Sequence, residues 1–315
     1  MTASRAIAIT GASGLLGAAL WAELTRAGDR PVALVRPGAL LQPGAAASAG
    51  ATIRWDPQAG TVDRAALEGV DAVVHLAGEN IAAGRWTEER KRRIEESRRL
   101  GTRTIATAVR DLATPPKVLI SASAVGYYGD RGDEVLTEES SPGSGFLADV
   151  CRVWEDAALP VLERGVRLVI VRIGVVISRK GGMLPRILVP FKAGLGGPVG
   201  SGLQYLSWIA LDDVVGAIRF ALETETLFGP VNLTGPEPVT SRDLAKTLGK
   251  VLRRPAILPA PTFALRIALG EMADQLLLSS ARAMPAKLRA AGYPFLAPTL
   301  EAALLRELAP QPGHS

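Results

Sequence analysis

Three glycines near the N-terminus have the spacing of a phosphate-binding turn. The segment Thr10–Gly17 reads TGASGLLG and places Gly11, Gly14 and Gly17 between an apolar run and an amphipathic one. Glycine permits a tight turn, lets the backbone approach a pyrophosphate, and lets a helix pack closely on the preceding strand. The free N–H groups at the start of such a helix bind phosphate. The segment predicts a dinucleotide-binding turn; the alternative is an ordinary turn between a strand and a helix.

Arg36 stands where a dinucleotide fold selects between NAD and NADP. An acidic residue about twenty positions after the turn binds the ribose 2′-OH of NAD, but the sequence has no Asp or Glu between Asp29 and Asp56. A guanidinium instead suits the 2′-phosphate of NADP, through paired charge-assisted hydrogen bonds. Arg36 therefore predicts NADP as the cofactor; the alternative is an arginine that merely ends a strand at the surface.

Short apolar runs alternate with amphipathic segments in the first half of the chain, which is typical of a parallel sheet covered on both faces. We expect strands at Arg5–Thr10, Pro31–Arg36, Thr52–Trp55, Ala72–Ala77, Lys117–Ser121 and Arg167–Arg172. We expect helices at Leu16–Ala27, Glu88–Leu112, Phe146–Arg164 and Leu211–Leu222. The predicted fold class is α/β, with a Rossmann doubly wound parallel sheet and a smaller C-terminal α/β substrate lobe.

The pattern loosens after Gly174, and glycine and proline become frequent between Gly181 and Gly202. We expect residues 1–174 to form the NADP-binding Rossmann domain, with its sheet completed by about 205–230. Residues 175–204 and 231–309 are expected to form the substrate lobe, and 310–315 a frayed tail.

The composition indicates a globular, cytoplasmic protein that acts on a small molecule. Of the 315 residues 48% are hydrophobic and 21% charged, which is enough for a buried core. A single cysteine, Cys151, excludes a disulfide framework and a multi-thiolate metal site. No apolar run reaches the length of a transmembrane helix. The most basic stretch, Arg85–Arg103, interleaves its cations with glutamates one helical turn apart, so we interpret it as a solvated helix face. We expect a monomer or homodimer without a nucleic-acid or membrane partner.

Further motifs resemble the extended short-chain dehydrogenase/reductase superfamily. HLAG (His75–Gly78) and SWIALDDVVGAI (Ser207–Ile218) are similar to its motifs, as is the glycine turn. More narrowly, the chain resembles NAD-dependent epimerase/dehydratase-like proteins, some of which carry an old cell-division-inhibitor label. The stretches that carry this second resemblance are His75–Arg98, Ser121–Glu134, Gly145–Glu155 and a C-terminal segment near Ala260–Leu308. The resemblance implies a Rossmann domain with a small substrate lobe.

The same resemblance implies cofactor contacts at matching positions. At the pyrophosphate turn these are Gly11, Ser13, Gly14, Leu15, Leu16 and Gly17. Arg36 would meet the 2′-phosphate, and Leu76 and Ala77 would lie beside the adenosine-side ribose. Arg98 stands where extended reductases place an asparagine near the nicotinamide-side ribose. Ser121 and Ala122 would end a strand beneath the nicotinamide.

The superfamily's usual catalytic pair, Tyr-x-x-x-Lys on one helix, is absent from the sequence. In that pair the lysine cation lowers the pKa of the phenol, ordinarily about 10, so that it can transfer a proton near neutral pH. The residues four positions after the tyrosines Tyr127, Tyr128, Tyr205 and Tyr293 are Arg131, Gly132, Ile209 and Ala297. In the corresponding helix, Phe146 or Leu147 replaces the tyrosine, and Val150 or Cys151 replaces the lysine.

Ser123 and Tyr128 are the remaining candidates for catalysis. Ser123, at a strand end, could donate to a substrate carbonyl, and Tyr128 could donate a proton from the following loop; packing under the cofactor is the alternative for Tyr128. Tyr127 and Arg131 have the four-residue spacing, but the glycine and aspartate between them predict a loop that does not align the pair.

Three other reactive side chains have simpler interpretations. Glu79 is either a base that faces the pocket or a carboxylate at its rim. His75 is expected to be a buried core histidine and Cys151 a small buried residue. With two histidines in the chain, neither a Ser-His-Asp triad nor a histidine-rich metal site is expected.

Two hypotheses of function follow. The first is an NADP(H)-dependent oxidoreductase or epimerase that acts on a small carbonyl-containing or sugar-like substrate. The second is a regulatory protein that senses NADP(H) without turning it over. The missing Tyr-Lys pair favours the second hypothesis, whereas the strand-end serine and the substrate lobe favour the first.

Overall fold

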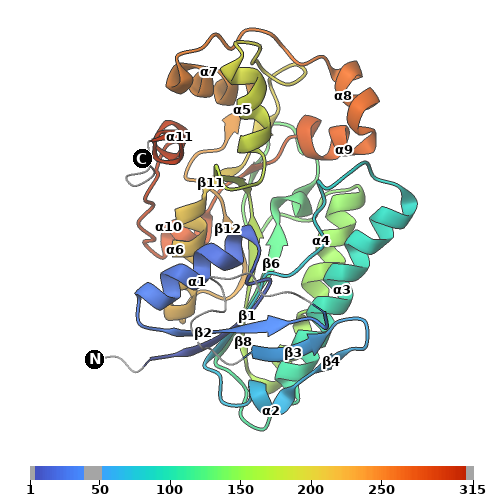
Figure 1. The fold of residues 1–315 in the computed structure, drawn as a ribbon, viewed down its shortest axis with the longest axis vertical. Helices are drawn as coiled ribbons and strands as arrows, with labels where there is room; N and C mark the ends of the chain where they lie inside the picture. Colours follow the sequence, from blue (N-terminus) through green and yellow to red (C-terminus); the bar gives the residue numbers. More distant parts are fainter. Residues whose placement is uncertain (1–3, 39–51, 310–315) are drawn as a thin grey trace. The chain divides into compact units, whose positions relative to one another are not determined.

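The computed structural model describes residues 4–38 and 52–309 of the chain (Figure 1). Its largest sheet has eight strands. In their order across the sheet they are β12 (Gly229–Leu233), β8 (Arg167–Ile173), β6 (Val118–Ala124), β5 (Ala72–His75), β1 (Ala6–Thr10), β2 (Arg30–Val35), β3 (Thr52–Asp56) and β4 (Thr61–Val62).

The sheet is wound in two directions from β1. This strand pairs in parallel with β2 and with β5, and the parallel pairing continues to β3 on one side and to β6 on the other. The short β4 pairs antiparallel with β3. All residues of β1 and β5 are buried, as the continuous apolar runs predicted. The doubly wound α/β fold expected from the sequence is therefore confirmed.

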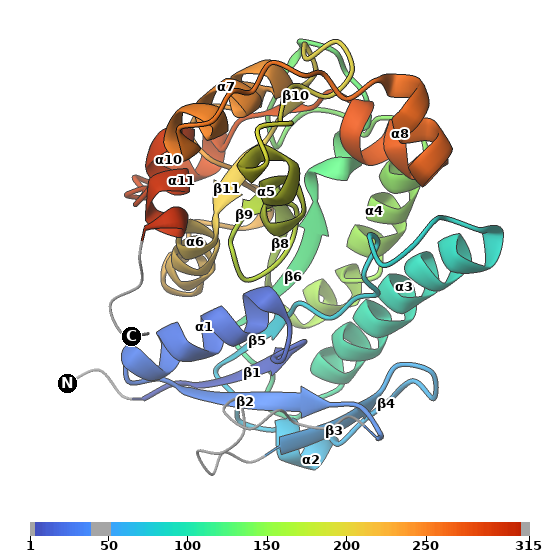
Figure 2. The same cartoon turned by 45° about the horizontal axis from the view of Figure 1, so that its top comes forward.

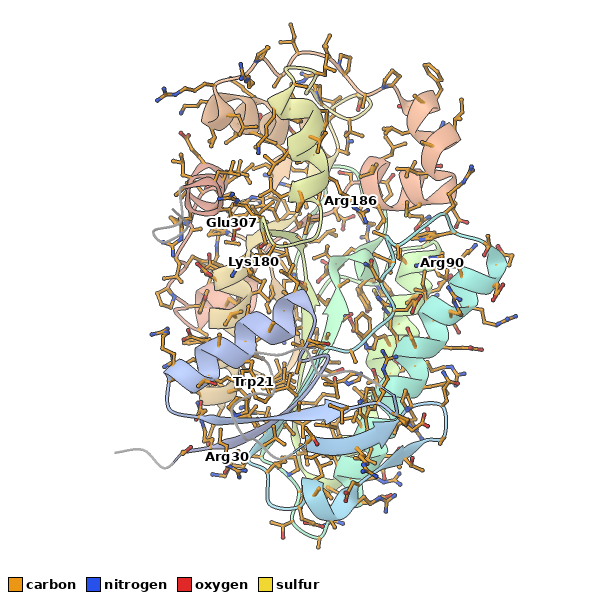
Figure 3. All side chains as sticks on the ribbon, viewed as in Figure 1. Trp21, Arg30, Arg90, Lys180, Arg186 and Glu307 are labelled. Carbon is orange, nitrogen blue, oxygen red and sulfur yellow. The ribbon has the colours of Figure 1, made fainter. Side chains whose placement is uncertain are left out.

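Helices cover both faces of the sheet (Figures 1 and 2). On one face lie α1 (Leu15–Arg26) and α6 (Leu211–Glu223), joined by an ion pair of 2.9 Å between Arg219 and Glu23. Trp21 points from α1 towards the sheet (Figure 3). On the other face lie α3 (Glu88–Arg110) and α4 (Phe146–Asp156). The short α2 (Arg64–Leu67) follows β4.

The alternation of side chains along β1 explains why both faces need cover. Ala6 and Ala8 belong to one apolar cluster with Ile105 and Val109 of α3. Successive residues of a strand point to opposite faces, so Ile7, which is also fully buried, points towards the α1 side. Both faces of the strand are thus desolvated.

Two boundaries differ from the expected ones by three residues or more and need correction. The helix expected over Phe146–Arg164 ends at Asp156, and a 3₁₀ turn follows at Leu159–Arg164. Pro160 explains the break, because it has no N–H to donate to the carbonyl of Asp156 and its ring clashes there. The strand expected to end at Ser121 continues as β6 to Ala124, because each of the residues Leu119 to Ser123 is buried.

The chain divides into two compact units. The first contains most of the large sheet and comprises Met1–Tyr127, Phe146–Arg172 and Val215–Val231. The second comprises Tyr128–Gly145, Ile173–Val214 and Asn232–Ser315. The expected tail at 310–315 lies outside the described residues.

Short strand pairs and helices make up the second unit. The pairs are β10 (Tyr205–Leu206) with β13 (Val239–Thr240), β9 (Val175–Ile177) with β11 (Trp208–Ala210), and β7 (Val135–Leu136) with β14 (Arg282–Ala283). The helices are α5 (Leu184–Lys192), α7 (Ser241–Leu252), α8 (Thr262–Leu269), α9 (Glu271–Ala273), α10 (Ala286–Ala290) and α11 (Leu300–Leu308). Its apolar core contains Phe191, Trp208 and Leu248. The Asp213 carboxylate accepts hydrogen bonds from the backbone N–H groups of Leu296 and Ala297, which fastens the C-terminal segment to this unit.

Candidate functional site

The glycine turn between β1 and α1 folds tightly on itself. Gly11 has a φ of +68°, which disfavours any residue with a side chain. A Cβ at Gly17 would lie 2.1 Å from the carbonyl oxygen of Gly11, so α1 can approach the turn this closely only with glycine at that position. Helix α1 begins after Gly14, which provides no side-chain cap. Its first N–H groups are therefore available to an anion, as a bound pyrophosphate requires.

Thr10 fixes this turn to the end of β5. Its Oγ1 accepts hydrogen bonds from the backbone N–H groups of Leu76 and Ala77, at 3.1 and 3.2 Å. The hydroxyl proton is then left to be donated to Nδ1 of His75, at 2.8 Å. Nδ1 is an acceptor, so the neutral imidazole carries its proton on Nε2. Burial lowers the pKa of His75 to about 4, which keeps the ring neutral. His75 is thus a buried structural residue, as expected.

Arg36 follows the end of β2 and is exposed. It lines an open cavity of about 400 Å³ together with residues that follow the end of β3. The complete lining is Arg36, Pro37, Gly38, Asp56, Pro57 and Gln58. Asp56 and Gln58 were missed in the sequence. The two residues could have been predicted, because β2 and β3 are parallel and their carboxyl ends therefore lie at the same edge of the sheet.

Ser121, Ala122 and Ser123 lie within β6, and all three are buried. The Ser123 hydroxyl donates a hydrogen bond of 2.7 Å to the Glu155 carboxylate on α4. That carboxylate forms a two-point ion pair with Arg172 of β8, with distances of 2.9 Å to Nε and 2.8 Å to a terminal nitrogen. The single proton of the Ser123 hydroxyl is used in its bond to this carboxylate. The geometry therefore opposes the expected donation from Ser123 to a substrate.

Tyr128 lies in a buried environment where its hydroxyl contacts other protein groups. Its side chain is fully buried, and its hydroxyl lies 3.0 Å from the carbonyl oxygen of Thr137 and 2.7 Å from Oδ1 of Asn232. These two acceptors compete for its one proton. This environment favours the packing alternative for Tyr128 over donation of a proton to substrate.

Tyr127, the preceding residue, is half-buried. The guanidinium carbon of Arg172 lies 3.4 Å from the centroid of its ring. This contact stacks the phenol on the ion pair formed by Glu155 and Arg172. Ser123, Tyr127, Glu155 and Arg172 thus form one connected group, which we call the β6 cluster.

Cys151 of α4 is, with Val150, one of the two residues that the resemblance places where the superfamily has its lysine. Burial raises the pKa of Cys151 to about 11, so the thiol is neutral and cannot replace a cation. The nearby cation is Arg98, which comes from α3. Its guanidinium carbon lies 4.7 Å from the centroid of the Trp154 ring, and one of its nitrogens donates to the carbonyl oxygens of Glu79 and Ile94, both at 3.1 Å. Burial lowers the pKa of Arg98, against a smaller opposing effect of the nearby Glu79 charge.

The Glu79 carboxylate forms ion pairs with two arginines of α3. It is 3.8 Å from Arg90, which Figure 3 labels, and 3.7 Å from Arg93. The backbone N–H of Glu79 donates to Ser97. These ion pairs engage the carboxylate, which supports the rim interpretation over that of a base.

The described residues contain neither a metal-binding cluster nor a membrane-spanning helix. Within 4–38 and 52–309, no group of three or more His, Cys, Asp or Glu side chains could hold a metal ion. In the same ranges, no helix is long and apolar enough to span a bilayer.

Comparisons with known proteins agree with this geometry. Residues 7–233 match the NAD dependent epimerase/dehydratase family, and residues 260–307 match a domain of unknown function, DUF1731. The chain is 44% identical over 302 residues to the epimerase family protein Mb2239 of Mycobacterium bovis, covering 96% of this chain and 97% of that protein.

Two solved structures also resemble the chain. The first is human epimerase family protein SDR39U1 with NADPH, with 31% identity, a TM-score of 0.85, and coverage of 96% of this chain and 98% of the other. The second is a nucleoside-diphosphate sugar epimerase from Corynebacterium glutamicum, with 37% identity, a TM-score of 0.78, and coverage of 97% and 58%. The glycine turn, the doubly wound sheet and these matches together show that the chain is an NAD(P)-binding member of the NAD-dependent epimerase/dehydratase family.

Proposed function

We propose that the protein is an NADP(H)-dependent oxidoreductase or epimerase that acts on a small carbonyl-containing or sugar-like substrate. The observation that carries this proposal is the glycine turn, in which Gly11 and Gly17 leave no room for a side chain and α1 begins without a capping side chain. When bound there, the nicotinamide would supply or accept a hydride. The similarity to a nucleoside-diphosphate sugar epimerase supports the substrate class.

The proposed cofactor contacts run from the pyrophosphate to the nicotinamide. The pyrophosphate would lie at Gly11, Ser13, Gly14, Leu15, Leu16 and Gly17. Leu76 and Ala77 would contact the adenosine-side ribose, because their backbone is fixed beside the turn by Thr10. Arg98, Ser121 and Ala122 would lie at the nicotinamide side.

We propose NADP rather than NAD on the strength of Arg36. Its guanidinium is exposed beside a cavity and suits a 2′-phosphate. The human relative was solved with NADPH, which supports the same choice. Asp56 and Gln58, in the same cavity, would then lie near the adenosine.

The test of this choice is Arg36→Asp. Loss of the charge-assisted bonds should weaken NADPH binding roughly 10- to 100-fold and leave NADH binding within about threefold, as measured by nicotinamide fluorescence. Arg30→Asp is a matched control, because Arg30 is an exposed arginine at the opposite end of β2 (Figure 3). An unchanged preference for NADPH in Arg36→Asp would contradict the cofactor assignment.

A non-catalytic NADP(H)-sensing protein is the second candidate, and one observation favours it. Neither of the two residues of α4 that the resemblance places at the lysine position, Val150 and Cys151, is a cation, because burial keeps the Cys151 thiol neutral. The two candidates differ in turnover. A panel of aldehydes, ketones and nucleotide sugars, followed by nicotinamide absorbance, should detect consumption of NADPH by an oxidoreductase. Tight NADPH binding without turnover of any carbonyl, and without epimerisation of any nucleotide sugar, would favour the sensor.

The expected cytoplasmic location and the monomeric or homodimeric state stay predictions.

A further inference from the structure

We propose that Tyr127 is the proton-transferring residue of this site, and that Arg172, Glu155 and Ser123 are positioning residues that hold its ring. The proposal rests on the proposed function, because it assigns the proton in a hydride-transfer reaction. It replaces the missing pair on α4 with a tyrosine on the turn after β6 and a cation on the neighbouring strand β8.

The position of Tyr127 follows from the chain direction. The 3₁₀ turn Val125–Tyr128 begins immediately after β6. β6 pairs in parallel with β5, so its end lies at the same edge of the sheet as Leu76 and the glycine turn. In doubly wound sheets ligands bind outside this carboxyl edge. Tyr127 is therefore at the edge that the cofactor is proposed to occupy.

The ring is held by a rigid chain of contacts. Arg172 lies 3.4 Å from its centroid and cannot rotate freely, because Glu155 binds the guanidinium at two points. Glu155 is in turn fixed by the hydrogen bond from Ser123. These residues come from β6, α4 and β8, so three elements determine one side-chain orientation.

The stack fixes the ring through a cation–π contact. A guanidinium over the face of a tyrosine ring is attracted by its π electrons. The usual pair has a lysine as the cation beside its tyrosine, whereas the cation beside Tyr127 is Arg172, which lies almost entirely out of solvent.

In the proposed reaction the proton of Tyr127 moves to the substrate oxygen while the hydride moves to the substrate carbon. In reduction, the carbonyl carbon of the substrate receives the hydride, and the electron pair of the C=O π bond forms the new O–H bond with the proton of Tyr127. The phenolate that remains recovers a proton from water. In oxidation the phenolate accepts the hydroxyl proton and the same steps run backwards.

The first test uses NADPH alone and needs no substrate. The four tyrosines are replaced by 3-fluorotyrosine, and their ¹⁹F resonances are assigned with Tyr→Phe variants. We expect NADPH to shift the Tyr127 resonance and to leave that of Tyr293 unmoved, since the Tyr293 hydroxyl is buried against Asp213. Arg172→Lys and Ser123→Ala should each shift or broaden the Tyr127 resonance. A Tyr127 resonance that does not respond to NADPH overturns the proposal.

The second test compares the two neighbouring tyrosines in turnover of any carbonyl that the wild type reduces. Tyr127→Phe keeps the stacked ring and loses the proton, so kcat should fall about 100-fold or more while the Kd for NADPH stays within about twofold. Tyr128→Phe should keep most of its kcat. The reverse pattern overturns the proposal. If the wild type binds NADPH but turns over no substrate, the proposed enzyme function is contradicted instead. The ¹⁹F experiment still decides whether Tyr127 lies beside the bound cofactor.

Discussion

The glycine turn and the β6 cluster lie at the same edge of one sheet, but they are built from different parts of the chain. The turn depends on backbone atoms and on glycines that have no side chain. All of these residues are close together in the sequence. The β6 cluster is made of side chains from four elements, β6, the 3₁₀ turn after it, α4 and β8. Its Ser123 and Arg172 are separated by 49 positions in the chain. The comparison teaches that the glycine turn depends on local sequence, whereas the β6 cluster depends on contacts between distant parts of the chain.

Glu155→Gln should cause the largest loss of stability, because it leaves the buried guanidinium of Arg172 without its charge partner. We expect the free energy of unfolding to fall by about 3–5 kcal/mol, as measured by urea denaturation. Asp149→Asn is the matched control on the same helix, since its pair with Arg152 is half exposed and should contribute less than about 1 kcal/mol. Equal losses in the two variants would contradict the assignment of a buried, structurally important pair.

A pH titration should reveal the His75–Thr10 contact at the cofactor end. His75 has a pKa of about 4 when folded, against an ordinary value of 6.5. Below pH 6.5 the unfolded chain binds a proton that the folded protein does not. The stability present above pH 6.5 should therefore decrease by roughly 3 kcal/mol as the pH falls to about 4.

The control for this titration is His75→Asn, whose side-chain oxygen can still accept the Thr10 proton. The difference in unfolding free energy between wild type and variant isolates the contribution of His75 from that of the carboxylates. A difference that does not change between pH 6.5 and 4 would show that the imidazole is not kept neutral by burial.

Gly17→Ala tests the tight packing of α1 on the turn. Alanine favours a helix by about 1 kcal/mol over glycine, but its Cβ would lie 2.1 Å from the backbone oxygen of Gly11, so the clash should win. We expect a net loss of about 2 kcal/mol and weaker NADPH binding. Gly84→Ala is the control, because a Cβ added at Gly84 would have no other heavy atom of the described residues within 4 Å beyond its chain neighbours. If both variants bind NADPH like wild type, the turn is not as closely packed as described.

Tyr128→Phe should have the smallest effect. It removes a hydroxyl from a buried contact with Asn232, at a cost of about 1 kcal/mol in unfolding free energy. NADPH affinity should not change. A selective loss of NADPH affinity without loss of stability would instead place Tyr128 in the cofactor site.

Features that depend on residues close together in the chain could be predicted from the sequence. Gly11, Gly14 and Gly17 mark the turn because conformational freedom is a property of the residue itself. The strands were predictable because strands buried on both faces form continuous apolar runs. The break in the α4 region was also encoded, since Pro160 removes a helical hydrogen bond.

The β6 cluster could not be read in the same way. Glu155 lies on a helix and Arg172 on a strand, and nothing in their spacing indicates that they meet. Tyr127 and Tyr128 are adjacent in the sequence, and the sequence alone favoured Tyr128 as the catalytic candidate. Only the three-dimensional arrangement distinguishes them, because one ring is stacked on a guanidinium and the other is buried with its hydroxyl between two acceptors.

Arg98 has a consequence for protein engineering. Restoring the usual motif by Leu147→Tyr with Cys151→Lys would bring an ammonium group close to a guanidinium that already influences the pKa of the residue at 151. Two cations in a partly desolvated space repel each other, so the lysine would be driven towards its neutral form. A transplanted Tyr-Lys pair therefore needs Arg98→Asn at the same time.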